Sequence, residues 1–327
     1  MIKRANAVAQ ILALGLLAAF AGPTFAQQDF PNKPIRILVS STPGGSSDLS
    51  ARLIGQKLTE SWGQPVIVDN RPGANSIIAA EALAKSAPDG HTTMLVQLAH
   101  VINPLVVANL PFDAIKDFAP VATITNSRYV LTINLSIPAN SLKEFIAYAK
   151  SRPGQLNYAS SGTASAAHLT TEILSSMVGI TMQHVPYKGP TQVLNDLAGG
   201  QVQVYLATAL TTLPYIVAGR IRAIAISGDT RSPALPQLPT FDEAGLPGFD
   251  MKNWYGFLAP GRTPRPVVSK LSAEIAKILT MPDTVAKLAS QGGDPFITTP
   301  EQFAELMKAD MARFARIIKT ANITIEK

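Results

Sequence analysis

Two short loops of glycine and small polar residues are the first candidates for chemistry in this sequence. The first loop follows the apolar run 35–39 and opens a helical pattern. Its candidate ligand residues are Thr42, Gly44, Gly45, Ser46, Ser47 and Asp48. A glycine pair lets the backbone approach a ligand closely, and the first free N–H groups of the helix point into the same space. The loop therefore predicts an anion site, and the alternative is a glycine pair that only turns the chain.

The second loop repeats this arrangement in the second half of the chain, after the strand pattern 156–160. Its candidate ligand residues are Ser160, Ser161, Gly162, Thr163 and Ser165. His168 follows one turn into the next helix, where it either donates to a ligand oxygen or satisfies a neighbouring carbonyl. Two such loops predict a cleft between two domains, which is where ligands bind in open α/β sheets.

Other polar residues near these loops have two readings each. Asp48 is expected to fix its loop by capping the helix, since a carboxylate repels a bound anion. Tyr187 either reaches the cleft with its hydroxyl or packs in the core. Arg71 and Arg128 are the cations nearest in sequence to the cleft edges, and ordinary surface arginines are the favoured interpretation.

Catalysis is not indicated by these residues. Ser161 and His168 would be a nucleophile and a base, yet no Gly-x-Ser-x-Gly elbow surrounds the serine and no acid orients the histidine. The first loop has neither a P-loop ending nor the dinucleotide glycine spacing. His91, His100 and His184 lack ligand-like spacing with carboxylates. We therefore expect no enzyme activity, no metal and no cofactor.

The N-terminus predicts a secretory signal over residues 1–26. Lys3 and Arg4 precede the apolar run 11–21, and small residues end at Ala26. The run is shorter than the roughly 20 apolar residues that a membrane span needs. The sequence contains no cysteine, which excludes disulfides, thiolate metal sites and a lipid-anchored cysteine. We expect a periplasmic mature chain that starts at Gln27.

The charge balance argues against nucleic acid as a partner. There are 28 Lys and Arg against 22 Asp and Glu, and removal of Lys3 and Arg4 leaves 26 against 22, a net charge of +4. This excess is spread along the chain without a basic run. A mildly positive surface modestly favours encounter with anionic solutes. We expect a monomer that binds a small molecule.

Strand and helix patterns alternate along most of the chain, which predicts an α/β fold with mainly parallel sheets. The pattern restarts near Val121, and a Pro- and Gly-rich stretch follows at 228–249. We expect one domain over 27–125 plus 228–327 and a second over 126–227, with two strand crossings as a hinge. Capping boxes predict helix starts at Ser141 with Glu144 and at Thr299 with Gln302.

Several short motifs in order resemble the Bug family, the periplasmic solute-binding proteins of tripartite tricarboxylate transporters. They are Pro34-Ile35, Pro43-Gly44-Gly45 with Asp48, Gly63-Gln64-Pro65-Val66, Asn70-Arg71-Pro72-Gly73-Ala74, Pro88-Asp89-Gly90, Pro186-Tyr187-Lys188-Gly189 and Thr299-Pro300-Glu301. The resemblance spans essentially the whole mature chain. It implies a two-lobed periplasmic-binding-protein (Venus flytrap) fold of two doubly wound domains. It also implies a small carboxylated solute held between the lobes, and the membrane components of a transporter as partners.

In the family, as the resemblance implies, carboxylates are held by backbone N–H groups and ordered waters from the two facing loops. This chain departs from the family pattern at two positions. His91 replaces the usual Tyr after Pro-Asp-Gly, and Ala207 stands where many members carry an acid that could meet an ammonium group. We therefore expect a di-, tri- or aromatic carboxylate without an amine, delivered to a transporter. The alternative is a periplasmic sensor that presents the solute to a receptor or kinase.

Overall fold

A computed structural model describes residues 30–163 and 165–320 of the chain. The chain separates into two units, Met1–Asn32 and Lys33–Lys327, and every helix and strand given below lies in the second. The expected signal peptide, 1–26, lies outside the described residues. Within those residues, no helix combines the length and apolar character needed to cross a bilayer.

A parallel sheet begins the second unit. Its central strand β1 (Ile35–Val39) pairs in parallel with β2 (Val66–Asn70) on one side and with β3 (Thr92–Gln97) on the other. The helical segments of this part are α2 (Ser46–Trp62), the 3-10 turn η1 (Ala74–Ser76), α3 (Ile77–Ala84) and α4 (Ala99–Val106). The strands are parallel, so their carboxyl ends share one edge, and the first loop leaves from that edge.

A second parallel sheet repeats the arrangement. Here β5 (Asn157–Ser160) pairs with β6 (Gln183–Pro186) and with β7 (Val204–Thr208). The helices of this part are α5 (Leu142–Lys150), α6 (Ala166–Val178), α7 (Pro190–Gly199) and α8 (Ala209–Val217). The second loop leaves from the carboxyl end of β5. Both loops therefore join a strand end to a helix start, as predicted.

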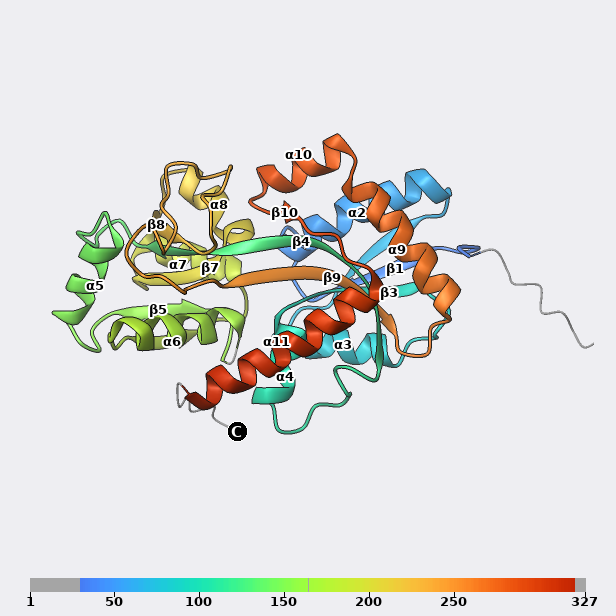
Figure 1. Cartoon of the computed structure of the whole chain (residues 1–327), viewed down its shortest axis with the longest axis horizontal. Helices are drawn as coiled ribbons and strands as arrows, with labels where there is room; N and C mark the ends of the chain where they lie inside the picture. The colour runs from blue at the N-terminus through green and yellow to red at the C-terminus, as the bar shows by residue number, and fades with distance from the viewer. Residues whose placement is uncertain (1–29, 164, 321–327) are drawn as a thin grey trace, which may run out of the picture. The chain divides into compact units, whose positions relative to one another are not determined.

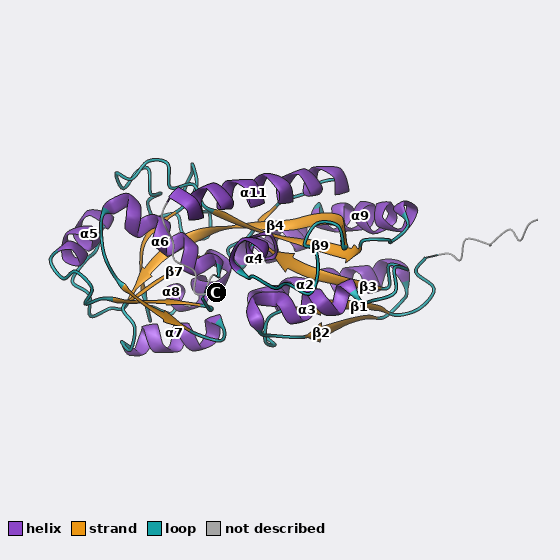
Figure 2. Cartoon of the chain, turned by 90° about the horizontal axis from the view of Figure 1, so that it is seen from below, coloured by secondary structure: helices purple, strands orange, loops and turns teal. Residues whose placement is uncertain are grey.

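Two long antiparallel strands connect the sheets. In β4 (Phe118–Ile133), residues 118–128 pair with β9 (Lys252–Pro260), and residues 129–133 pair with β7 and with β8 (Arg222–Ile226). The strand order is β2-β1-β3-β9-β4-β7-β5-β6, and Figure 2 shows the two long strands running side by side. An α/β fold of two sheets joined by crossing strands is confirmed. The exact domain boundaries stay a prediction.

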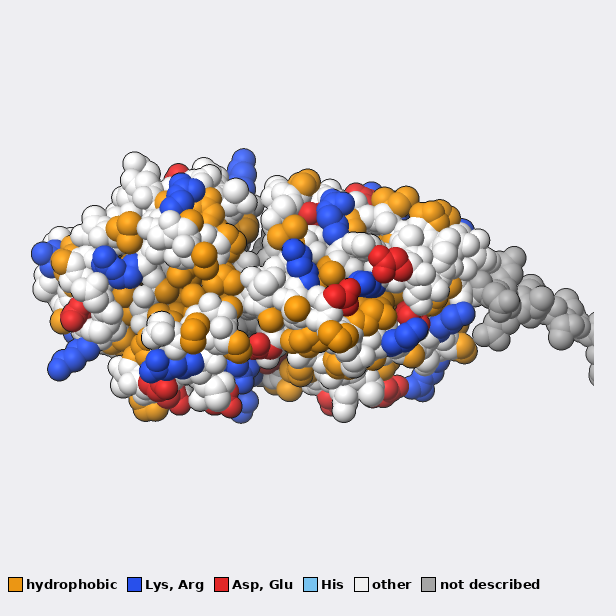
Figure 3. Space-filling model, turned by 90° about the horizontal axis from the view of Figure 1, so that it is seen from above, with side chains coloured by type: hydrophobic (Ala, Val, Ile, Leu, Met, Phe, Trp, Pro, Cys, Tyr) orange, Lys and Arg blue, Asp and Glu red, His pale blue; other side chains and the backbone are white. Residues whose placement is uncertain are grey.

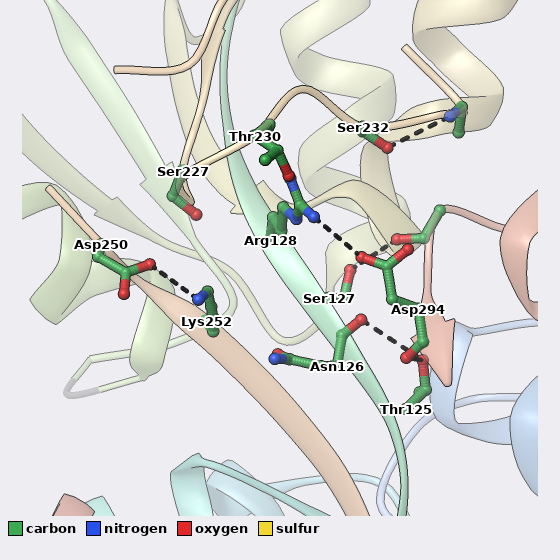
Figure 4. Close-up of polar contacts among 12 residues, drawn as sticks. Thr125, Asn126, Ser127, Arg128, Ser227, Thr230, Ser232, Asp250, Lys252 and Asp294 are labelled. Atoms are coloured by element: carbon green, nitrogen blue, oxygen red, sulfur yellow. Dashed lines mark hydrogen bonds and ion pairs between the residues drawn. The ribbon is translucent and has the colours of Figure 1, made fainter. Parts of the chain in front are cut away.

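Polar contacts fasten the middle of β4 to two connecting segments (Figure 4). Arg128 donates to the carbonyl of Thr230 and forms an ion pair with Asp294 at 3.4 Å. Thr125 Oγ1 donates to the Asp294 carbonyl over 2.9 Å, beside the pairing of β10 (Asp294–Pro295) with β4. Arg128 is thus engaged in holding the crossing region together.

Three helices close the described part of the chain: α9 (Arg265–Leu279), α10 (Pro282–Ser290) and α11 (Pro300–Thr320). The predicted capping box of α11 is confirmed, because Thr299 Oγ1 accepts from the Gln302 N–H at 3.2 Å and Gln302 Oε1 accepts from the Thr299 N–H at 2.9 Å. The helix packs beside β4 (Figure 1). Its fully buried Phe303 fills the space over Gly256 of β9.

Two helices were not predicted from the sequence. Both α4 and α8 are short and contain an internal proline, Pro104 and Pro214 respectively. Proline removes a helical hydrogen bond, so neither segment looks helical by pattern. The capping box at Ser141 and Glu144 is confirmed.

On the face in Figure 3, charged side chains of both signs are interspersed with neutral and hydrophobic ones.

Candidate functional site

A cavity of about 600 Å³ lies where the two loops meet the crossing strands. The predicted site residues that line it are Thr42, Ser46, Ser47, Ser161, Gly162, Thr163, Ser165, Tyr187 and Ala207. The predicted residues that do not line it are Gly44, Gly45, Asp48, Ser160 and His168. Both loops are thus brought to one cavity, although these five residues do not line it.

The first loop uses its glycine N–H groups within the protein. The Gly44 N–H donates to Asp48 Oδ2 over 2.9 Å, and the Gly45 N–H donates to the Thr42 carbonyl over 3.1 Å. Gly45 is the N-cap of α2, so Ser46 and Ser47 are its first two helical residues. The first N–H groups of a helix have no acceptor within the helix. The candidate donors toward the cavity are therefore the N–H groups of these two serines and not those of the glycines.

Asp48 holds this loop from behind, as predicted, but it is not the N-cap. It lies in the first turn of α2, its side chain is 2% exposed, and both its oxygens pair with the Arg52 guanidinium at 2.9 Å. Asn70 Nδ2 donates to it over 2.9 Å. Burial raises the pKa of Asp48, but the hydrogen bonds from Arg52, Gly44 and Asn70 outweigh burial and hold the pKa below its usual range.

Asp48→Asn is expected to reduce the free energy of unfolding at pH 7 by about 1–3 kcal/mol, since it breaks charge-assisted hydrogen bonds. Because the folded pKa is depressed, this stabilisation is complete above the unfolded pKa of about 3.9 and is lost as pH falls through the folded pKa. Urea denaturation at pH 7, 5 and 3 measures this. Asp283→Asn, which removes an exposed ion pair with Lys57, is the control with little expected effect. If the difference in the free energy of unfolding between the wild-type protein and Asp48→Asn is the same at pH 3 as at pH 7, the ionised Asp48 carboxylate is not the source of this stability.

The second loop is also held by its own polar groups. Ser165 is the N-cap of α6, and its Oγ accepts from the His168 N–H at 3.3 Å. His168 is buried and its ring stacks on that of His184, with centroids 3.9 Å apart. Tyr187 lines the cavity, but its hydroxyl donates to Asp196 over 2.9 Å and is therefore engaged within the protein.

A strained segment that the sequence analysis did not assign to the site forms another wall. Ala74, Asn75 and Ser76 have φ of 45°, 48° and 77°, and all three line the cavity. Left-handed backbone is costly for residues with a Cβ, and such strain concentrates at functional sites. The buried Asn103 holds it: its Nδ2 donates to the Asn75 carbonyl over 2.9 Å, and its Oδ1 accepts from Asn75 Nδ2 over 2.7 Å. The sequence feature that marks this wall is the Asn70–Ala74 motif, but from the sequence it indicated only a loop and not a part of the site.

Three buried tyrosines from the crossing region line the cavity as well. Tyr129 comes from β4, Tyr205 from β7 and Tyr255 from β9. Burial raises the pKa of all three, so they are neutral and carry a proton at pH 7. The Tyr255 hydroxyl lies 3.3 Å from Ser46 Oγ, which joins this wall to the start of α2. Protonated hydroxyls are hydrogen-bond donors suited to an anion.

Charge in the cavity comes from a single residue. Lys188, which follows β6, is the only charged residue among the described residues that line it, and none of them is an acid. Of the arginines considered from the sequence, Arg71 pairs with Asp69 and Arg128 pairs with Asp294, and neither lines the cavity. The cavity is therefore suited to an anion and lacks a partner for an ammonium group.

Comparison with known proteins identifies the relatives of this chain. The profile of the tripartite tricarboxylate transporter family receptor, TctC, matches residues 50–323. Among similar solved structures is the periplasmic binding protein BugD, at 29% identity and a TM-score of 0.85, with 91% of this chain and 100% of that chain covered. The relatives are solute-binding proteins rather than enzymes.

Two similar structures contain ligands. An R. palustris protein with adipate is 35% identical, with a TM-score of 0.88 and coverage of 90% of this chain and 99% of that chain. MatC from Rhodopseudomonas palustris with bound malate is 32% identical, with a TM-score of 0.81 and coverage of 88% and 100%. Both ligands are dicarboxylates. The predicted Bug-type binding-protein fold is confirmed by these comparisons.

Proposed function

The chain belongs to the tripartite tricarboxylate transporter receptor family, TctC, and from this premise we propose that it captures a small carboxylate that has no amino group. The signal-like N-terminus supports export, and the family supports delivery of the solute to the membrane components of a tripartite transporter. Binding in the periplasm and release to those components complete the proposed role. The adipate and malate complexes of similar proteins support a dicarboxylate as the first candidate class.

The observation that carries the proposal is the wall composition of the cavity. It combines two helix starts, three buried tyrosines and Lys188, without an acidic residue among its described lining. Helix N-termini carry partial positive charge and free N–H groups, which stabilise a carboxylate without a buried cation. An α-amino acid would bring an ammonium group that no described lining residue neutralises. We therefore expect that the cavity does not bind α-amino acids.

Capture proceeds by closure of one sheet and its helices over the other. The ligand first contacts the N–H groups of one loop, and closure then adds the second loop and removes water, which strengthens each polar contact. An affinity near micromolar, roughly 8 kcal/mol, is expected for such a receptor. A few charge-assisted hydrogen bonds with partial apolar burial are sufficient for that affinity after the cost of ordering.

A thermal-shift screen tests the proposal directly. Dicarboxylates, tricarboxylates, aromatic acids and α-amino acids are added at 1,000-fold above a micromolar Kd, where binding stabilises the protein by roughly 4 kcal/mol. At least one non-amine carboxylate is expected to raise Tm, while amino acids leave it unchanged. Isothermal titration then gives Kd. An amino acid that outcompetes every simple carboxylate would refute the proposed ligand class, and no shift with any carboxylate would refute capture itself.

Delivery to a transporter is tested separately, in cells. Deletion of the gene is expected to slow growth on the bound carboxylate as sole carbon source, because uptake then lacks its receptor. Complementation with the wild-type gene is the control. Unchanged growth and uptake, with altered transcription in response to the solute, would support the sensor alternative instead.

A further inference from the structure

Two histidines lie directly behind the second loop and take no part in the proposed ligand contacts. His184 of β6 stacks on His168 of α6 with ring centroids 3.9 Å apart and an interplanar angle of 3°. The Tyr158 ring of β5 contacts both histidines, with centroids 5.0 Å from His184 and 6.2 Å from His168, and its hydroxyl donates to Glu172. The stack places the His184 ring firmly against the end of β5.

Ser160, the buried last residue of β5, connects this ring to the loop. Its Oγ lies 2.8 Å from the Gly162 carbonyl oxygen, 3.2 Å from the Gly162 nitrogen and 2.7 Å from His184 Nε2. A serine hydroxyl has one proton and two acceptor lone pairs. The proton goes to the carbonyl and one lone pair accepts from the Gly162 N–H. The remaining lone pair needs a donor, so His184 Nε2 carries a proton.

The protonation state of His184 agrees with this count of donors and acceptors at Ser160 Oγ. Burial, together with the neighbouring His168, lowers the pKa of His184 to about 4. At pH 7 the ring is therefore neutral and has a single N–H. For the three contacts of Ser160 to be satisfied together, that N–H is on Nε2 and not on Nδ1.

The loop peptide held in this way has a defined direction. The Gly162 carbonyl accepts from Ser160 Oγ and also from the Ser165 N–H at 3.1 Å. In a planar trans peptide the C=O and the following N–H point in opposite directions. The Thr163 N–H therefore points away from Ser160, and both Gly162 and Thr163 line the cavity. The φ of 134° at Gly162 suits glycine alone.

We propose that His184 is a positioning residue: through Ser160 it fixes the Gly162–Thr163 peptide with its N–H directed at the bound carboxylate. The inference rests on the proposed capture of a carboxylate for its consequence, while the Ser160 contacts concern the ligand-free protein alone. Without the Nε2 donor, Ser160 Oγ loses one of its three partners. The loop then samples other peptide orientations, and the donor is presented for less of the time.

Hydrogen–deuterium exchange of the ligand-free protein, followed over peptides spanning 157–168, is the first test. His184→Phe keeps an aromatic ring in the stack but has no donor, and it is expected to raise exchange in this loop roughly tenfold. His184→Gln places a side-chain N–H near the position of Nε2, and is expected to restore slow exchange. Ser160→Ala removes all three contacts and is expected to raise exchange at least as much as His184→Phe. The double variant is expected to exchange no faster than Ser160→Ala alone, since His184 acts through that hydroxyl.

Two further measurements complete the test. Adipate titration is expected to show roughly tenfold weaker binding for His184→Phe and near wild-type binding for His184→Gln. Nitrogen-15 NMR of the wild-type protein is expected to show the Nε2–H tautomer at pH 7, whether or not a variant folds. The Nδ1–H tautomer, or wild-type exchange in His184→Phe, would overturn the inference. Absence of adipate binding by the wild-type protein, with the exchange results as expected, would instead count against adipate as ligand and leave the positioning role supported.

Discussion

Ser46→Pro is expected to weaken binding of adipate, or of the carboxylate with the largest thermal shift, by roughly 10- to 100-fold while leaving Tm unchanged. Ser46 is the first residue of α2, so proline there removes an N–H that the helix itself does not use. The preceding Gly45 has φ −71° and ψ 164°, a conformation that a residue before proline readily adopts. A hydrogen bond to a charged group contributes about 1.5–3 kcal/mol, which gives the expected factor.

Ser46→Ala is the matched control for this prediction. It keeps the N–H and removes only the hydroxyl, which lies 3.3 Å from the Tyr255 hydroxyl. Titration calorimetry on both variants, with circular dichroism and melting curves, separates loss of the donor from loss of fold. Wild-type affinity in Ser46→Pro would mean that the Ser46 N–H does not hold the ligand. Equal losses in both variants would assign the role to the Ser46 hydroxyl instead.

Gly256→Ala is expected to destabilise the protein by overpacking its core. A Cβ at this position would lie 2.6 Å from Phe303 Cζ and 3.0 Å from the Ala122 carbonyl oxygen. Phe303 is fully buried, so its ring has no free space to enter. Overpacking of this kind costs about 1–3 kcal/mol, and a fall in Tm of roughly 2–5 °C follows for a chain of this size.

A double-mutant cycle locates the cause of that loss. Phe303→Leu alone leaves a cavity and destabilises the protein, but combined with Gly256→Ala it is expected to cost less than the sum of the two changes, since the shorter side chain makes room for the Cβ. Gly199→Ala on α7 is the control, because a Cβ there meets no atom within 4 Å. Additive effects of Gly256→Ala and Phe303→Leu would show that the strain lies elsewhere.

Features encoded by adjacent residues could be predicted from the sequence. Strand β1, both capping boxes and the two loops depend on local chemistry, and each was found where the residues indicated it. The role of Asp48 as a residue that fixes its loop was likewise readable, because a carboxylate in the first turn of a helix has few other uses. Its partner Asn70 is further along the chain and was not predicted.

The rest of the cavity depends on pairings between distant segments. Tyr129, Tyr205 and Tyr255 meet only because β4 pairs with both β7 and β9, and no local pattern encodes that register. The left-handed backbone at Asn75 depends on Asn103, which belongs to a helix that the sequence pattern did not reveal. Lys188 was part of a quoted motif, but its place on the cavity wall follows from the position of β6.

The glycine pair of the first loop is the clearest case of a correct motif with a revised atomic meaning. The sequence predicts backbone N–H donors at the two glycines, because glycine permits close approach of the backbone to a ligand. In the structure both glycine N–H groups are engaged by Asp48 and Thr42, and Ser46 and Ser47 line the cavity instead. The hydrogen-bond partners of a loop, which depend on its folded conformation, decide which of its amides remain for a ligand.

The long strand β4 also constrains the order in which the chain can fold. Residues 118–128 find their antiparallel neighbour only at residues 252–260, so β3 and β4 are not joined until the ribosome has made most of the protein. Pairings of such long sequence separation form slowly, because chain entropy is lost before contacts compensate for it. The second sheet can therefore form before the first is joined to it by β9, and the pairing of β9 with β3 and β4 completes the fold last.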